Sequence, residues 1–218
     1  MRRFALALLL ACALPAAAPQ SPPSQAAPEQ KQYDKPQGIY ATINMSGAES
    51  AIRQLGQLIP YERRNAIAAA VANAPRLAPP VLYALANAIS LDDANMGDAV
   101  FWYHVARLRA VYDGLRCKDA SARNAVNVFG KGLSPDISRY QRQNRQYTLQ
   151  VAELAIKWDQ QNPRNYDYRW INLYGKVART SAGTDPSELT VPENEWPDIL
   201  KRVHEAHLKS VQEFAAQK

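Results

Sequence analysis

The sequence has few cysteines, glycines and histidines, and each shortage argues against a class of protein. With two cysteines in 218 residues, Cys12 and Cys117, the chain is not a disulfide-stapled scaffold. Its nine glycines form no glycine-rich phosphate-binding loop, and no serine stands in a GxSxG context. His204 and His207 are three positions apart, whereas the HExxH zinc helix needs four. The sequence therefore predicts no catalytic residue, no metal site and no cofactor.

Long apolar runs are also scarce. The longest covers residues 4–14 and is too short to span a bilayer as a helix. Arg2 and Arg3 precede it and Ala16-Ala17-Ala18 follows it, which is the pattern of an export signal. We predict that residues 1–18 are a signal peptide, that the mature protein is periplasmic or secreted, and that it keeps no transmembrane helix.

A second cleavage site competes with this one. Leu9-Leu10-Ala11-Cys12 is similar to a bacterial lipoprotein box, and cleavage there would leave a lipid anchor at Cys12. This alternative is not favoured, because Leu10 is not the small residue usual at that position. Removal of Cys12 with the signal would leave Cys117 without a disulfide partner. For Cys117 itself we expect a small buried residue at a helix end, in preference to a reactive thiol.

Proline is abundant, at 15 residues, and it marks helix ends. Residues 19–37 are rich in Pro, Gln, Ala and Ser and offer too little apolar surface to fold, so we expect a flexible tether. The whole chain is 47% apolar and 21% charged, an ordinary globular composition. We expect residues 38–218 to form a single helical domain, with a short extended segment at residues 38–45.

The stretch of residues 96–116 organises the predicted fold. Drawn as a helix at about 100° per residue, it carries a bulky apolar stripe and an alanine-rich stripe on roughly opposite sides. The bulky stripe is Phe101, Val105, Leu108, Tyr112 and Leu115, and the other is Ala99, Tyr103, Ala106 and Ala110. A helix with two apolar faces is covered on both sides. We therefore predict an all-α fold, an irregular bundle of antiparallel helical hairpins around this central helix.

The same stretch carries a resemblance. Ala99, Tyr103 and Ala106 are similar to the Ala-x₃-Phe-x₂-Ala spacing in the second helix of a tetratricopeptide-type repeat, and residues 79–90 would be its first helix. The likeness covers about one hairpin, residues 79–115, and the usual Trp and Leu-Gly of the first helix are missing. It implies a local tetratricopeptide-like hairpin, not a solenoid.

Prolines and apolar spacing predict the remaining helices. Residues 46–59 suit an amphipathic helix that ends at Pro60, and Pro60 suits the first position of the next helix, which runs to about residue 73. A short helix follows at residues 122–129. Ser134-Pro135 then begins a helix that continues at helical spacing to Pro163. The chain closes with an amphipathic helix over residues 196–214.

Charge narrows the choice of partner. The formal net charge of +6 falls to +4 if Arg2 and Arg3 leave with the signal, and no basic run stands out. Export and this mild charge argue against nucleic acid. An acidic protein surface or an envelope anion is the better candidate partner.

Two groups of residues are candidates for partner binding. One flank of the central helix carries Trp102, Arg109, Asp113 and Arg116, where Arg109 and Asp113 are four apart and can pair. This flank is either a helix-surface ion pair or a polar groove that meets an anionic partner. The second group is an aromatic patch, which either packs in the core or forms an interface; it comprises Tyr166, Tyr168, Arg169 and Trp170.

Two functions remain. The first is an exported helical binding module that engages a protein or envelope partner, for example a toxin neutraliser or an envelope assembly factor. The alternative is a cell-envelope hydrolase that acts on cell-wall polymer. The sequence favours the first, because it contains no recognisable nucleophile, metal or acid-pair constellation.

Overall fold

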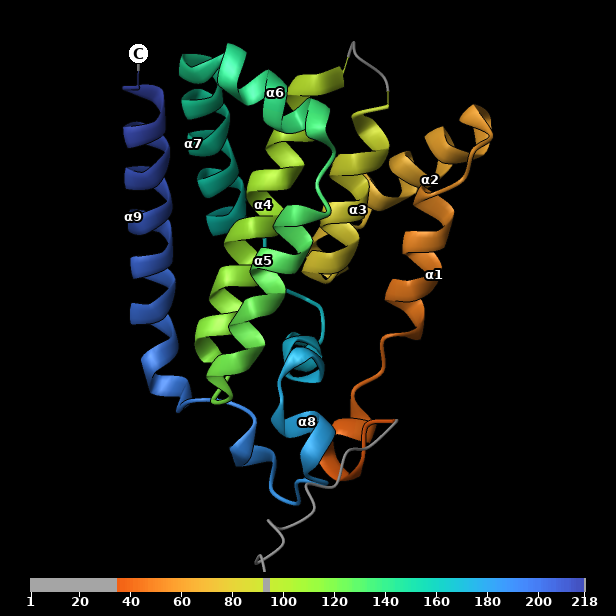
Figure 1. Cartoon of the computed structure of the whole chain (residues 1–218), viewed down its shortest axis with the longest axis vertical. Helices are drawn as coiled ribbons and strands as arrows, with labels where there is room; N and C mark the ends of the chain where they lie inside the picture. Colours follow the sequence, from red (N-terminus) through yellow and green to blue (C-terminus); the bar gives the residue numbers. More distant parts are fainter. Residues whose placement is uncertain (1–34, 92–94, 218) are drawn as a thin grey trace, which may run out of the picture. The chain divides into compact units, whose positions relative to one another are not determined.

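A computed structural model describes residues 35–91 and 95–217, and these residues contain helices and no β-strand. The chain has an all-α fold, as predicted (Figure 1). The α-helices are α1 (Ser46–Leu55), α2 (Pro60–Ala72), α3 (Pro79–Ile89), α4 (Met96–Arg116), α5 (Asn124–Lys131), α6 (Pro135–Gln143), α7 (Arg145–Gln161), α8 (Val177–Thr180) and α9 (Trp196–Ala215). The described residues also include 3₁₀ helices: η1 (Gly38–Thr42) precedes α1, and connecting segments contain η2 (Ala74–Arg76), η4 (Ala120–Arg123), η5 (Tyr168–Tyr174), η6 (Pro186–Glu188) and η7 (Glu193–Glu195).

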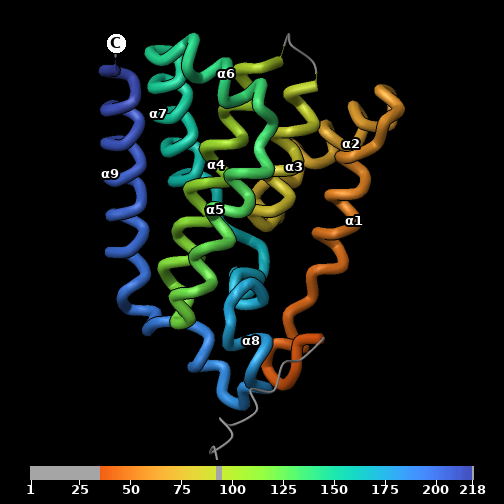
Figure 2. Tube along the Cα trace, in the orientation of Figure 1, coloured from red at the N-terminus to blue at the C-terminus, as the bar shows by residue number. Residues whose placement is uncertain are grey.

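Helix α4 lies at the centre of this bundle. It packs against α3, α7 and α9, and also against α5 and α6 (Figure 2). Both of its apolar stripes are covered, since Val105 and Leu108 from one stripe and Ala99 and Ala106 from the other are buried. Tyr103 is only partly buried. The prediction of a central helix over residues 96–116 is confirmed to the residue.

Proline sets the helix starts that the sequence predicted. Pro60, Pro79 and Pro135 each occupy the first turn of a helix, where the missing N–H costs no hydrogen bond. The Ser134 side chain accepts a hydrogen bond from the backbone N–H of Asp136 and so caps α6. Local chemistry is sufficient to explain these boundaries.

Three local predictions were wrong. Residues 38–42 form the 3₁₀ helix η1 in place of an extended segment. Helix α1 ends at Leu55, four residues early, and an irregular turn leads to Pro60. The expected helix of residues 135–163 is broken at Asn144, whose backbone is non-helical (φ −128°, ψ 53°). The Asn144 side chain donates to the carbonyl of Tyr140, a local bond that competes with helix continuation.

Helices α3 and α4 pack along each other, as a helical hairpin requires. Their kinship to tetratricopeptide repeats stays a prediction. Beyond α4, Cys117 is fully buried, and its thiol donates to the Asn172 side chain at 3.1 Å. Burial raises the pKa of this thiol to about 11, as expected for a structural cysteine.

The predicted signal peptide, the box around Cys12 and most of the tether lie outside the described residues. Within residues 35–91 and 95–217, no helix is both long and apolar enough to cross a bilayer.

Candidate functional site

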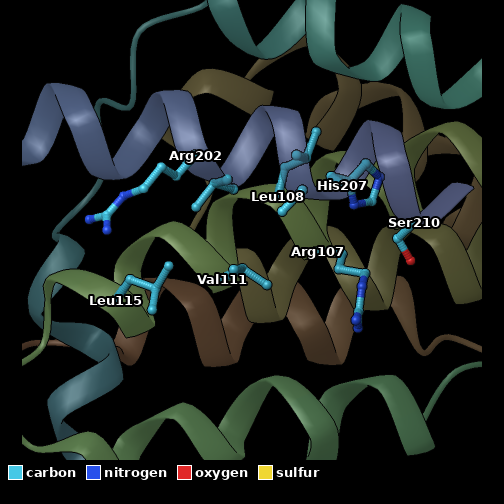
Figure 3. Close-up of a pocket in the computed structure, with 9 residues that line it drawn as sticks. Arg107, Leu108, Val111, Leu115, Arg202, His207 and Ser210 are labelled. Carbon is cyan, nitrogen blue, oxygen red and sulfur yellow. The ribbon is translucent and has the colours of Figure 1, made fainter.

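The candidate site is a groove between α4 and α9. Its floor is apolar and is built from both helices (Figure 3). Arg202 and Leu115 lie at one end, and Arg107, His207 and Ser210 lie at the other. The volume is about 330 Å³, and the lining residues are Arg107, Leu108, Val111, Leu115, Arg202, Val203, Ala206, His207 and Ser210. We call this hollow the α4–α9 groove.

A second hollow, of about 400 Å³, continues the groove toward the end of α9. The two hollows share Arg107, His207 and Ser210, and the second one reaches Phe214. It adds Arg142 from α6 to the basic groups. No acidic side chain of the described residues lines either hollow. The combined surface therefore has an apolar floor in the α4–α9 groove and a more polar, basic continuation, which is a combination suited to an acidic amphipathic ligand.

No protein-family model, curated protein or solved structure matches this chain.

Two histidines lie beneath the shared part of the groove. The Nδ1 atom of His104 and the Nε2 atom of His207 are 3.0 Å apart, so one ring donates a proton to the other. Burial, with the charge of Arg107 and the neighbouring His204, lowers the pKa of His207 to about 4. Burial beside His207 and Arg107 also lowers the pKa of His104 well below its usual value. Both rings are thus neutral at pH 7, and the arginines supply the charge of the groove.

This pair makes stability depend on pH. The pKa of His207 falls from 6.5 in the unfolded chain to about 4 in the folded one, so the unfolded state binds more protons between these values. The domain should lose stability as the pH falls from about 6.5 to 4, by roughly 2–3 kcal/mol for this residue.

Urea titrations at several pH values test this, with His207→Gln as the control that keeps a neutral polar group at the pair. In the His207→Gln variant, the free energy of unfolding should fall less between about pH 6.5 and 4, because the contribution of His207 is absent. An identical pH dependence in both proteins would contradict the assignment of a neutral, partly buried His207.

Asp159 on α7 holds the two walls of the groove together. Its carboxylate accepts from Nε of Arg109 on α4 at 2.9 Å and bonds to Nε2 of His204 on α9 at 2.9 Å. Arg164 forms a third ion pair with it. Burial alone would raise the pKa of Asp159, but the bond to His204 and the charges of Arg164 and Arg109 hold it below its usual value. One carboxylate therefore connects α4, α7 and α9.

Asp113 is the centre of a second buried cluster. Arg116 pairs with it at 2.5 Å, and the Trp170 indole and the Tyr166 hydroxyl donate to it at 2.7 and 3.0 Å. Burial raises the pKa of the Asp113 carboxyl, although Arg116 opposes this. The Arg116 guanidinium stacks on the Tyr168 and Trp196 rings, each 4.5 Å away. The contacts of this cluster hold η5 and the start of α9 against α4.

The structure therefore brings most of the predicted site residues together, but in the interior. Trp102, Arg109, Asp113, Arg116 and Trp170 are buried, so their side chains offer no surface to a partner in this conformation. The predicted Arg109–Asp113 surface pair was wrong, because Arg109 pairs with Asp159 and Asp113 with Arg116. Tyr166 is partly buried and turned toward Asp113.

Tyr168 and Arg169 keep partial exposure, and Arg169 also pairs with Asp167 at 2.7 Å. A partner-binding role for these two residues stays a prediction. His204 and His207 point to Asp159 and His104 respectively, and no metal-binding group of His, Cys, Asp and Glu occurs within the described residues.

Sequence reasoning missed the groove itself. Its lining residues Arg107, Arg202, Ala206 and Ser210 are not among the residues that the sequence analysis identified. The available signal was the solvent side of the last amphipathic helix, where Arg202, Ala206 and Ser210 recur at four-residue spacing. That spacing places them along one line of α9, but it does not reveal which helix faces them.

Proposed function

We propose that this chain is an exported binding protein whose α4–α9 groove engages an acidic amphipathic helix of a partner protein. The observation that carries the proposal is the combination of an apolar floor with Arg107 and Arg202 at its ends and no lining carboxylate among the described residues. Apolar side chains of the partner would lie on Val111 and Leu115, which line the groove and are partly exposed, and its carboxylates would meet the arginines.

The length of the groove favours a helix over a compact ligand. From Arg202 to Phe214, α9 rises about 18 Å at 1.5 Å per residue, which matches roughly three turns of a bound helix. Helix-in-groove recognition uses anchors at positions i, i+3, i+4 and i+7, which span about 10.5 Å and therefore fit within this length.

The supports of the groove favour a preformed site. Asp159 ties both walls to α7, and His204 and His207 anchor the buried side of α9. A surface that is already ordered loses less entropy when a partner binds. Export is supported by the pattern of residues 1–18, and a toxin neutraliser or an envelope assembly factor would both act through such a contact.

Binding of a defined peptide tests the proposal. The probe is a synthetic helix of about 15 residues with Leu at i, i+3, i+4 and i+7 and Glu on both flanks. We expect it to bind the full chain, and we expect Arg202→Glu to weaken binding about tenfold or more, because attraction becomes repulsion. Isothermal titration calorimetry measures both affinities.

The matched control is Lys157→Glu, which makes the same charge change at an exposed position of α7 outside the groove. A peptide with the same composition in scrambled order should not bind. Equal weakening by Lys157→Glu and Arg202→Glu would show that the peptide senses only net charge, and the groove would then not be the site.

A further inference from the structure

The α1–α2 hairpin exposes a cluster of apolar side chains that the groove does not use. Leu58 is 89% exposed, Ile59 is 55% exposed and Tyr61 is 66% exposed. Leu58 and Ile59 lie in the turn between the two helices, and Tyr61 lies in the first turn of α2. The turn that joins α1 and α2 lies away from the other helices of the bundle (Figure 1). We call residues 56–61 the α1–α2 tip.

Arginines surround this tip. Arg53 on α1 and Arg64 on α2 are exposed, and Glu62 is the one acidic residue between positions 51 and 64. Arg63 stabilises the turn itself: its guanidinium donates hydrogen bonds to the backbone carbonyls of Gln57 at 3.0 Å and Leu58 at 3.4 Å. These bonds fix the turn, so the apolar side chains are presented outward by an ordered backbone.

We propose that the α1–α2 tip docks the protein on an anionic lipid surface. Leu58 and Ile59 would enter the boundary between headgroups and acyl chains, and Tyr61 would lie at headgroup level, where amphipathic aromatic rings gather. Arg53 and Arg64 would contact anionic headgroups. A basic rim around an apolar tip is complementary to such a surface, which presents negative charge above an apolar layer.

The docking surface is separate from the proposed partner groove. Helix α9 and the α1–α2 hairpin lie on opposite sides of α4 (Figure 1). The lipid contact therefore stands independently of the proposed function, and it leaves the α4–α9 groove free while the protein is docked.

A dye attached at the tip tests the proposal in the full chain. The protein carries Cys12→Ser and Leu58→Cys and is labelled with an environment-sensitive fluorophore; the native Cys117 is buried and does not compete. The probe is a vesicle of phosphatidylcholine with about a third phosphatidylglycerol, matched by a vesicle of phosphatidylcholine alone. We expect a blue shift and quenching by bilayer-embedded quenchers with the anionic vesicle. Adding Arg53→Glu and Arg64→Glu should weaken this response about tenfold or more.

The matched control is Leu154→Cys in the same Cys12→Ser chain, because Leu154 is 58% exposed on α7 and away from the tip. Its dye should not respond, which separates docking by the tip from attachment through residues 1–18. The proposal is overturned by an unchanged dye at position 58 or by equal responses at positions 58 and 154. It is also overturned by equal responses to both vesicles, or by a concentration-dependent shift without vesicles, which would identify a second copy as the occupant.

Discussion

Replacing Asp159 with alanine should remove a large part of the stability of the helical domain. The change leaves Arg109 fully buried without its carboxylate and also removes the partner of Arg164 and His204. Removing one member of a buried ion pair costs about 3–5 kcal/mol, because the remaining charge stays desolvated and unpaired. Typical domains have about 5–15 kcal/mol in total, so we expect a large fall in the midpoint of urea unfolding.

The matched control is Asp136→Ala, which removes the carboxylate of the exposed Arg139–Asp136 pair on α6. Exposed pairs contribute about 0–1 kcal/mol, so this variant should unfold close to the wild type. If the two alanine variants lost similar stability, the pairing of Asp159 with residues of α4 and α9 would not be a major contribution to the stability of the domain.

Truncation of Trp170 should have the second largest effect on stability. The indole is completely buried, packs against the Phe129 and Tyr174 rings, and donates to Asp113 at 2.7 Å. Trp170→Ala should cost about 3–5 kcal/mol through the cavity and the lost hydrogen bond. Circular dichroism at helical wavelengths measures the loss in urea without depending on tryptophan emission.

Two variants separate the contributions. Trp170→Phe keeps much of the ring packing and removes the indole N–H, so it should cost clearly less than Trp170→Ala. Tyr174→Ala changes the same aromatic cluster at a position that is 40% exposed, and it should also cost less. A Trp170→Ala protein as stable as the wild type would contradict the placement of η5 against α4.

The sequence alone predicted those features of the fold that neighbouring residues in the chain determine. The first-turn prolines at positions 60, 79 and 135 fix helix starts by their own backbone geometry. The two apolar stripes of residues 96–116 predict that other helices pack on both sides of this helix, and neighbouring helices bury residues of both stripes in α4.

Long-range pairing could not be predicted in the same way. Arg109 has Asp113 four residues away, so local reasoning assigned that partner, whereas the structure supplies Asp159 fifty positions later. A helical position predicts which face a side chain occupies but not which distant helix covers it. The groove could not be predicted from the sequence for the same reason, because its walls come from α4 and α9, which are about 90 residues apart in the chain.

A charge exchange across the α4–α9 groove tests whether Arg202 meets an acidic flank of a helix bound there. The affinity of the Arg202→Glu protein is measured by calorimetry with the acidic peptide and with a peptide that carries Lys in place of the Glu on one flank. If Arg202 meets an acidic flank of a bound helix, the Lys peptide should bind the variant about tenfold more tightly than the acidic peptide does, and the order should reverse for the wild type. An acidic peptide that kept the same affinity for both proteins would contradict binding of an acidic helix at Arg202.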